Sequence, residues 1–275
     1  MATGPVQHLA VFGQPIAHSL SPAIHAQLAA PLDCPIDYQA IECGPGQLKQ
    51  QLDALQHAGG VGCNVTVPLK LEAIDCADTV HASAQRAGAA NTLVWDGRWH
   101  AHNTDGKGVV RDWCRQGIEV NHRSVLIIGA GGAVAGILPS LVDQSPCRID
   151  LINRTQARAQ QLVDQWADRY PLQAIGSSEV RSSYDVVIQA TSLGHQGRLP
   201  DLDSAWFGPD SWMYDLNYGP AHAGLRQWCI EHAVSCADGL GMLVEQAALA
   251  FELFTGLEPN TAPVHRWLRQ RGAQP

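Results

Sequence analysis

Five small residues follow an apolar run in the middle of the chain, and they suit the binding of a phosphate group. The apolar run 125–128 leads into Gly129-Ala130-Gly131-Gly132-Ala133, and a helical pattern continues to about residue 142. Gly129 permits a tight turn, Gly131 lets the backbone approach a pyrophosphate, and the helix N-terminus supplies free N–H groups. Val134 stands where a third glycine or an alanine is usual. This order of strand, turn and helix predicts a dinucleotide site.

The end of the next predicted strand, 148–152, carries cationic side chains. Asn153-Arg154-Thr155 follows it, and Arg158 lies one helical turn after Arg154. An Asp or Glu at this place usually binds the ribose of NAD, whereas arginine binds phosphate through a bidentate fork. Asp150 is the competing ribose ligand, but the apolar strand continues beyond it. The alternative for the two arginines is an exposed helix start. We predict NADP rather than NAD.

Lysine is rare in this chain, so the position of Lys70 is informative. Only three of the 18 basic residues are lysines, and lysine, unlike arginine, can give up its proton. Lys70 follows a predicted strand in which Asn64 and Thr66 alternate with apolar residues and therefore face one side. Ligands bind at the carboxyl ends of strands in α/β sheets. Lys70 is thus a candidate acid–base group, the alternative being an ordinary exposed lysine.

Hydroxyl groups gather at the start of the first predicted helix. Ser19 and Ser21 stand there, and we expect Ser21 to be the N-cap with Pro22 at the first helical position. Hydroxyls at a helix N-terminus also suit a carboxylate ligand. The sequence leaves a cap and a carboxylate site as equal alternatives.

Three more polar residues stand in positions that suit a ligand. Asn91 begins a predicted hairpin strand, and Asp105 either forms a turn with Gly106 or caps the next helix. Gln246 belongs to the apolar stripe of the predicted helix 239–254, and a buried amide needs a partner. A bound polyol would provide that partner.

The remaining pattern predicts two α/β domains. Strands alternate with helices, which implies mainly parallel sheets, and Asp96-Gly97 predicts a hairpin that adds an antiparallel edge. The last helices are expected to return to the first domain. The predicted strands are 8–12, 36–41, 61–67, 91–95, 98–102, 125–128, 148–152, 172–175, 184–190 and 212–216, and the main further helices are 22–30, 46–57, 155–170 and 239–254.

Composition and charge exclude several classes of protein. The 275 residues are 45% hydrophobic and 16% charged, typical of a globular chain, and the net charge of −8 argues against nucleic acid and anionic membranes as partners. We see no signal peptide and no apolar run near the roughly 20 residues of a membrane span. The eight scattered cysteines form no C-x-x-C pair, which favours reduced thiols in the cytoplasm. No histidine spacing predicts a metal site.

Several segments in register resemble the shikimate dehydrogenase family, whose members reduce 3-dehydroshikimate to shikimate with NADPH. The resemblance covers nearly the whole chain and is carried by segments 12–22, 64–70, 88–93, 103–106, 129–133, 153–155 and 238–246. It implies a Rossmann-type NADP-binding domain, residues 107–239, and a discontinuous substrate-binding domain, residues 1–106 with 240–275. It also implies a step in the biosynthesis of chorismate and the aromatic amino acids, carried out by a cytoplasmic monomer or homodimer.

The resemblance also implies a role for individual residues. Lys70 and Asp105 would be the catalytic pair, with Lys70 donating a proton to the ketone oxygen during reduction and accepting it in reverse. The substrate carboxylate would be bound by Ser19 and Ser21, with help from Tyr218, and the hydroxyls by Asn64, Thr66, Asn91 and Gln246. The cofactor would contact Gly129, Ala130, Gly131, Gly132, Ala133, Asn153, Arg154, Thr155, Arg158, Thr191 and Gly239.

Two positions depart from the family pattern. Gln189 stands where asparagine is common, and Gly224 stands where proline is common. Both affect loops expected near the nicotinamide or the carboxylate. The alternatives are a quinate/shikimate dehydrogenase with relaxed substrate or cofactor use, an NADP-linked enzyme for another carbonyl compound, and a regulator that binds a shikimate-type ligand without turnover. The presence of Lys70, Asp105 and the glycine loop favours the enzyme.

Overall fold

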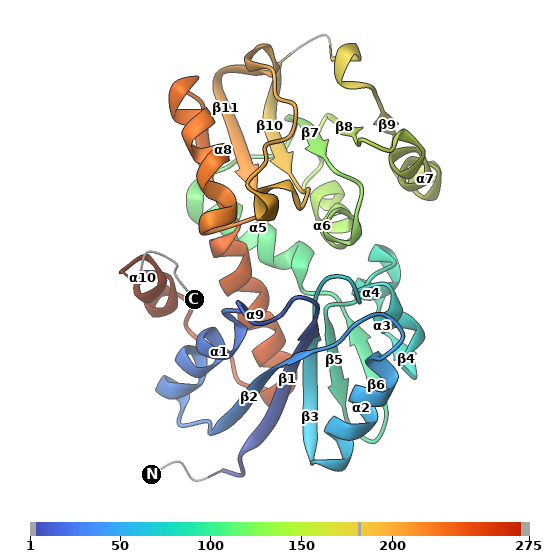
Figure 1. Cartoon of the computed structure of the whole chain (residues 1–275), viewed down its shortest axis with the longest axis vertical. Coiled ribbons are helices and arrows are strands. Elements are labelled where there is room, and N and C mark those ends of the chain that lie inside the picture. Colours follow the sequence, from blue (N-terminus) through green and yellow to red (C-terminus); the bar gives the residue numbers. More distant parts are fainter. Residues whose placement is uncertain (1–3, 181–182, 271–275) are drawn as a thin grey trace. The chain divides into compact units, whose positions relative to one another are not determined.

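The computed structural model describes residues 4–180 and 183–270, and the chain divides into two compact units (Figure 1). The first unit comprises Met1–Gly108 and Leu243–Pro275, and the second comprises Val109–Met242. Along the chain, helices α5 (Asp105–Gln116) and α9 (Leu240–Thr255) pass from one unit into the other. Each unit contains a six-stranded sheet with helices, so the predicted α/β class is confirmed.

The sheet of the first unit has the strand order β2-β1-β3-β5-β6-β4. β1 pairs in parallel with β2 and β3, while β3–β5 and β5–β6 are antiparallel. The predicted hairpin is present, but it does not form the edge, because β4 pairs beyond β6. Strand β4 has only two residues, so the sequence shows no alternating pattern that could predict it. The strands are β1 (Gln7–Gly13), β2 (Ile36–Glu42), β3 (Gly60–Val65), β4 (Thr79–Val80), β5 (Thr92–Trp95) and β6 (Trp99–His102).

Strand β1 is buried on both faces, and its side chains divide the core of the first unit into two layers. Ala10 and Phe12 belong to the layer that contains Leu48 and Leu52 of α2 (Leu48–His57). Leu9 and Val11 point to the other face, because side chains alternate along a strand, and pack with Ala250 and Phe254 of α9. The other helices of this unit are α1 (Ser21–Ala29), α3 (Glu72–Asp75), α4 (Ala82–Ala87) and α10 (Ala262–Gln270).

The sheet of the second unit is entirely parallel, with the order β12-β11-β10-β7-β8-β9. Val125 and Ile127 of β7 pack on one core layer, and Leu126 and Ile128 pack on the other. Helices cover both faces, as parallel sheets require. The elements are β7 (Ser124–Ile128), α6 (Gly132–Asp143), β8 (Arg148–Ile152), α7 (Gln156–Trp166), β9 (Leu172–Ala174), β10 (Tyr184–Gln189), β11 (Phe207–Asp215), α8 (Pro220–Glu231) and β12 (Ser235–Ala237).

Two boundaries matter for the site. Strand β3 ends at Val65 rather than Val67, although the Thr66 N–H still donates to Phe12 O of β1; Val67 is 61% exposed and already belongs to the following turn. Helix α1 begins at Ser21, and its N-cap is Leu20, which makes no side-chain cap bond. The prediction that Ser21 is the N-cap is therefore wrong, because the helical backbone starts one residue earlier than the serine–proline pair suggested.

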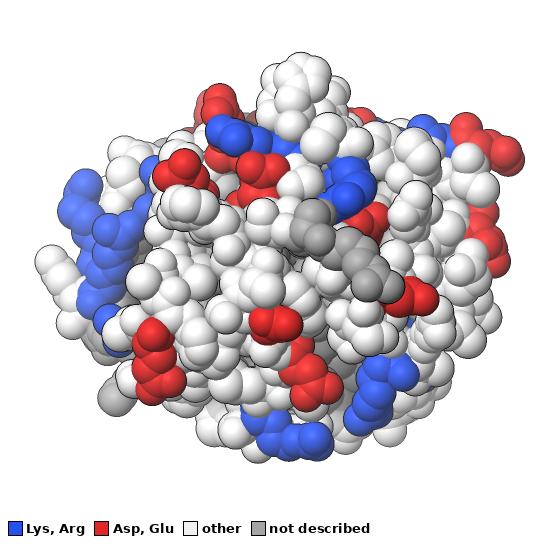
Figure 2. Space-filling view, turned by 90° about the horizontal axis from the view of Figure 1, so that it is seen from above, with Lys and Arg blue, Asp and Glu red and all other residues white. Residues whose placement is uncertain are grey.

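Acidic and basic side chains are interspersed among uncharged ones on the face shown in Figure 2. The chain as a whole carries 26 acidic and 18 basic residues. Among the residues described, no helix is long and apolar enough to cross a membrane.

Candidate functional site

Lys70 and Asp105 form a close ion pair in the first unit. Lys70 lies in the turn after β3, and Asp105 is the first residue of α5. Lys70 Nζ donates to Asp105 Oδ2 at 2.5 Å, and the two side chains are only 13% and 5% exposed. The two charges attract each other more strongly with so little water around them, but the loss of hydration is costly, so the pair needs further hydrogen bonds.

Asn91 provides one of those further bonds. Its Nδ2 lies 2.9 Å from Asp105 Oδ1, 2.9 Å from Thr104 Oγ1 and 3.2 Å from Gln246 Oε1. Two amide hydrogens face three acceptors, so the network can exchange one partner for a ligand oxygen. The Asp105 N–H donates to Asn103 Oδ1 at 3.0 Å, which fixes the start of α5. Asn91 and Asn103 thus hold Asp105 through its Oδ1 and its backbone N–H, while Lys70 binds its Oδ2.

Asn64 is buried, and both ends of its side-chain amide already form hydrogen bonds. Its Oδ1 accepts from Tyr38 Oη at 2.7 Å, and its Nδ2 donates to Asn91 O and Thr92 Oγ1, both at 3.1 Å. Burial raises the pKa of Tyr38, so the phenol stays protonated and acts as a donor. A ligand oxygen would find both amide hydrogens of Asn64 in use, and only a lone pair of Oδ1 remains.

The hydroxyls at the start of α1 lie in the same unit. Ser19 Oγ accepts the N–H of Ser21 at 3.3 Å, and the Ser21 hydroxyl interacts with Tyr38. Tyr38 therefore connects Ser21 with Asn64, a role that sequence analysis missed because a tyrosine in a strand carries no motif. Thr66 approaches Gly13 closely, since a Cβ at Gly13 would lie 2.4 Å from Thr66 Cγ2.

The first unit therefore brings together most of the predicted substrate and catalytic residues. The ones connected by hydrogen bonds are Lys70, Asp105, Asn91, Gln246 and Asn64, and Ser21 joins them through Tyr38. Tyr218 belongs to the second unit, where it follows β11, and burial raises its pKa. Thr104 and Thr92, which sequence analysis did not single out, complete the network.

The glycine turn of the second unit has the backbone that a pyrophosphate site needs. Gly129 has φ of +129°, and a Cβ there would lie 3.0 Å from Ala190 O, so the position favours glycine. Gly131 is the N-cap of α6 with no side-chain bond, and a Cβ there would meet nothing within 4 Å. The free N–H groups of this helix start, with the dipole behind them, can bind an anion.

Two cations flank the start of α7. Arg154 and Arg158 are exposed, and neither is paired with a carboxylate within the described ranges. Thr155 is the N-cap without a side-chain bond, and Asn153 Nδ2 donates to Thr155 O at 2.8 Å. Cations at a helix N-terminus oppose the helix dipole, so an anionic ligand would stabilise them.

Asp150, the competing ribose ligand, is engaged inside the sheet. It is 3% exposed, it accepts a hydrogen bond from the Tyr184 hydroxyl, and Arg148 Nε lies 3.2 Å from its Oδ2. Because this carboxylate is buried and already hydrogen-bonded, it is not available to bind a ribose at the end of β8.

Thr191 and Gly239 lie at the carboxyl ends of β10 and β12. Gly239 donates to Asn217 O at 2.9 Å, and a Cβ there would lie 2.4 Å from Leu216 O, so only glycine fits. Gln189, the departure from the family pattern, bonds through its side chain to both the N–H and the O of Thr191. The turn after β10 is thus held by the side chain of Gln189 together with Asn217, whose Nδ2 also donates to Thr191 O at 3.0 Å.

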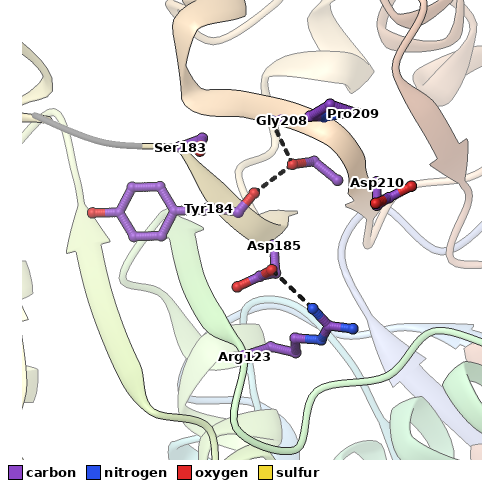
Figure 3. A pocket seen from close by; sticks show the side chains of 8 residues that line it. Arg123, Ser183, Tyr184, Asp185, Gly208, Pro209 and Asp210 are labelled. Atoms are coloured by element: carbon purple, nitrogen blue, oxygen red, sulfur yellow. Dashed lines mark hydrogen bonds and ion pairs between the residues drawn. The ribbon is translucent and has the colours of Figure 1, made fainter.

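A pocket lies at the amino-terminal edge of this sheet, and its lining residues are shown in Figure 3. It is lined by Arg123, Ser183, Tyr184, Asp185, Gly208, Pro209, Asp210 and Ser211. Arg123 Nη1 lies 3.3 Å from Asp185 Oδ1, and the pocket adjoins the amino ends of β7 and β10. Ligands of parallel α/β sheets bind at the carboxyl edge, so this pocket is not the nucleotide site.

A parallel sheet with a glycine turn at its carboxyl edge, together with a second α/β unit that holds a lysine–carboxylate pair, is the architecture of a nucleotide-dependent oxidoreductase. Three family models match the chain. Residues 11–93 match the shikimate dehydrogenase substrate binding domain, residues 114–196 match shikimate / quinate 5-dehydrogenase, and residues 239–269 match the shikimate 5'-dehydrogenase C-terminal domain.

Individual proteins agree with these models. Shikimate dehydrogenase (NADP(+)) of Acidovorax ebreus is 45% identical over 266 residues, covering 94% of each chain. The crystal structure of shikimate dehydrogenase from Aquifex aeolicus has a TM-score of 0.88 at 30% identity, over 98% of this chain and 100% of that one. The Thermus thermophilus enzyme in complex with NADP(H) and shikimate has a TM-score of 0.86 at 31% identity, over 96% and 99%. The chain belongs to the shikimate dehydrogenase family.

Proposed function

We propose that this chain catalyses the reversible reduction of 3-dehydroshikimate to shikimate with NADPH, a step towards chorismate and the aromatic amino acids. The observation that carries the proposal is the Lys70–Asp105 pair at 2.5 Å, embedded in a network of amides and hydroxyls. Family membership, with relatives named shikimate dehydrogenase (NADP(+)), supports the oxidoreductase activity and the cofactor.

In this proposal Lys70 controls the proton and Asp105 controls its position. The carbonyl oxygen of the substrate gains negative charge during reduction, so the Lys70 ammonium stabilises it and donates the proton, and the amine takes the proton back in reverse. Asp105 keeps Lys70 in place through Oδ2 and, held by Asn91 at Oδ1, orients the substrate hydroxyl. Bound NADPH supplies the hydride.

The substrate contacts follow from the same network. Ser19 and Ser21 bind the carboxylate through their hydroxyls at the start of α1, and Tyr218 assists them. Asn91 and Gln246 exchange their mutual bond for bonds to ring hydroxyls. Thr66 binds a further hydroxyl, and Asn64 contributes through its remaining Oδ1 lone pair and by holding Asn91 in place.

The second unit binds the cofactor in this proposal. The uncapped start of α6 takes the pyrophosphate through the backbone of residues 129–133, and Arg154 and Arg158 take the 2′-phosphate, with Asn153 and Thr155 beside them. Thr191 and Gly239 line the nicotinamide end at the same sheet edge. Asp150, engaged by Tyr184, does not compete for the ribose.

The proposal extends to the organisation of the protein. We assign substrate binding to residues 1–106 with 240–275 and NADP binding to residues 107–239. We place the protein in the cytoplasm, because all eight cysteines, which lie within the described residues, are free thiols. As the family resemblance implies, we propose that it is a monomer or a homodimer. The net charge of −8 makes a nucleic-acid partner unfavourable.

A panel of two substrates and two cofactors tests this function. Specificity constants are measured for 3-dehydroshikimate and 3-dehydroquinate, each with NADPH and with NADH. We expect the highest value for 3-dehydroshikimate with NADPH. A higher value for 3-dehydroquinate would establish a quinate enzyme, a higher value with NADH would reject the arginine argument, and binding of shikimate without any turnover would establish a regulator.

A further inference from the structure

A chain of interacting side chains in the second unit is not used by the proposed reaction. It connects the end of β11, the first turn of α8 and the edge strand β12. Asp215 ends β11, His222 lies on α8, and Cys236 of β12 packs in the same cluster as Cys229 of α8. Three of these side chains, Asp215, His222 and Cys229, are buried, whereas Cys236 is half-buried and reachable from solvent.

Asp215 fixes the orientation of the imidazole. His222 Nδ1 donates to Asp215 Oδ2 at 2.9 Å, and Asp215 Oδ1 accepts the N–H and the Nδ2 of Asn217, both at 3.0 Å. The His222 side chain also hydrogen-bonds to Cys236. A thiol, an imidazole and a carboxylate in this order form an activated nucleophile.

The charges around the cluster favour a thiolate on Cys236. Hydrogen bonds from the Cys229 thiol and from His222 lower the pKa of Cys236, and the nearby Arg226 acts in the same direction. Burial opposes the charge on His222, but its bonds to Asp215 and Cys236 outweigh that effect and raise its pKa to about 9. Burial raises the pKa of Asp238, the remaining acidic group beside the cluster.

Cys229 is placed to act as the second thiol. It is fully buried, it donates to the Cys236 sulfur, and that bond together with burial raises the pKa of Cys229. A partly exposed thiol with a lowered pKa and a buried thiol in the same cluster are the arrangement of a redox-responsive cysteine pair.

We propose that Cys236 is a peroxide-reactive cysteine and that Cys229 converts its sulfenic acid into a disulfide within the second unit. In the first step the Cys236 thiolate attacks one oxygen of hydrogen peroxide, the O–O bond breaks, and the leaving hydroxide takes a proton from the His222 imidazolium to form water. In the second step Cys229 attacks the sulfenic sulfur, and the hydroxyl leaves with the Cys229 proton as a second water. Two thiols are oxidised and one peroxide is reduced.

The test treats the full chain with hydrogen peroxide near neutral pH and maps every cysteine by mass spectrometry, with dimedone as the probe for sulfenic acid. We expect the wild type to lose two hydrogen atoms from the Cys229–Cys236 pair. Cys229→Ser should instead accumulate dimedone-labelled Cys236, and Cys236→Ser should leave Cys229 unoxidised. His222→Gln should slow the oxidation of Cys236 about tenfold or more, since the thiolate fraction falls.

Cys147→Ser is the matched control, because Cys147 is an exposed thiol outside the cluster. It should form the Cys229–Cys236 disulfide at the wild-type rate. Oxidation of Cys114 or Cys147 before Cys236 would overturn the proposal. So would an unlabelled Cys236 in Cys229→Ser, provided that circular dichroism shows the variant to be folded. A labelled Cys236 with no disulfide in the wild type would reject the role of Cys229.

Discussion

Tyr38 and Asn64 lie on strands that flank β1 on opposite sides, and their side chains meet across it: Tyr38 Oη donates to Asn64 Oδ1 at 2.7 Å. Asn64 in turn donates to the backbone of Asn91, which donates to Asp105. A residue without any recognisable motif thus supports the orientation of the carboxylate that pairs with Lys70.

Replacing this phenol should affect both stability and binding. Tyr38→Phe leaves Asn64 Oδ1 buried without a donor, which costs about 1–3 kcal/mol in the free energy of unfolding. It should also raise the KM for shikimate, because Ser21 and Asn64 lose a common partner. Urea denaturation and steady-state kinetics measure the two effects. The control is Tyr170→Phe, because Tyr170 is half-buried and its hydroxyl donates to Pro146 O. This variant should leave the KM unchanged. An unchanged KM in Tyr38→Phe would contradict the positioning role of Tyr38.

Ser21→Ala should change binding far more than stability. The N-cap of α1 is Leu20, so no cap bond is lost, and the serine is expected to contribute mainly uniform binding of the carboxylate. The KM for shikimate should rise with kcat nearly unchanged, and the melting temperature should fall only slightly, because the interaction of the Ser21 hydroxyl with Tyr38 is lost. A lower melting temperature with unaltered kinetics would assign Ser21 a purely structural role.

Arg154→Ala, and less strongly Arg158→Ala, should narrow the preference for NADP over NAD. Loss of one charge-assisted bond to the 2′-phosphate weakens NADP about ten- to a hundredfold and leaves NAD unaffected. Both side chains are exposed, so stability should not change. Specificity constants for each cofactor at saturating shikimate provide the measurement, with the exposed Arg98→Ala as control. An unchanged ratio in both arginine variants would mean that the 2′-phosphate binds elsewhere.

The sequence predicted the parts of the fold that depend on local periodicity. The apolar run of β7 follows from burial on both faces of the sheet. The predicted apolar stripe of α9 is present, but the helix is buried around most of its surface, since Val244, Ala248 and Phe251 outside the stripe are buried too. The short edge strands β4 and β12 were not predicted, because two or three residues show no alternation, and α8 was not singled out.

The candidate site was predictable only where a motif or an unusual residue marked it. Lys70 and Asp105 fall into this class, and the structure places them in contact. The roles of Tyr38, Thr92 and Thr104 depend on strand order, which brings residues from distant segments together and leaves no trace in local pattern. The hydrogen bonds around Asn64 and Asn91 were likewise not predictable from local pattern, because each bond joins two different segments of the chain.

His25 should make the protein sensitive to acid. It stacks on Tyr38 with ring centroids 4.2 Å apart, and burial lowers its pKa to about 3, against a smaller opposing effect of Asn64. In the unfolded chain a histidine binds its proton near pH 6.5, so the unfolded state holds one more proton between about pH 6.5 and 3. The free energy of unfolding should therefore fall as the pH decreases through this window, by up to about 1.4 kcal/mol per pH unit.

Urea unfolding as a function of pH measures the effect of His25. His25→Phe should reduce the slope by one proton, whereas the exposed His57→Gln should leave it unchanged. His102, whose pKa burial lowers to about 4, adds a similar contribution that persists in both variants. An identical slope in wild type and His25→Phe would reject the assignment.

Lys70→Ala tests the central claim most directly. The measurement is NADPH oxidation with 3-dehydroshikimate, together with the dissociation constant of shikimate. Lys49→Ala is the control, because Lys49 is 65% exposed and pairs with Asp53 on α2. The account predicts a loss of turnover of at least about 100-fold for Lys70→Ala, with shikimate binding retained and Lys49→Ala unaffected. A turnover of Lys70→Ala within a few-fold of the wild-type value would contradict it.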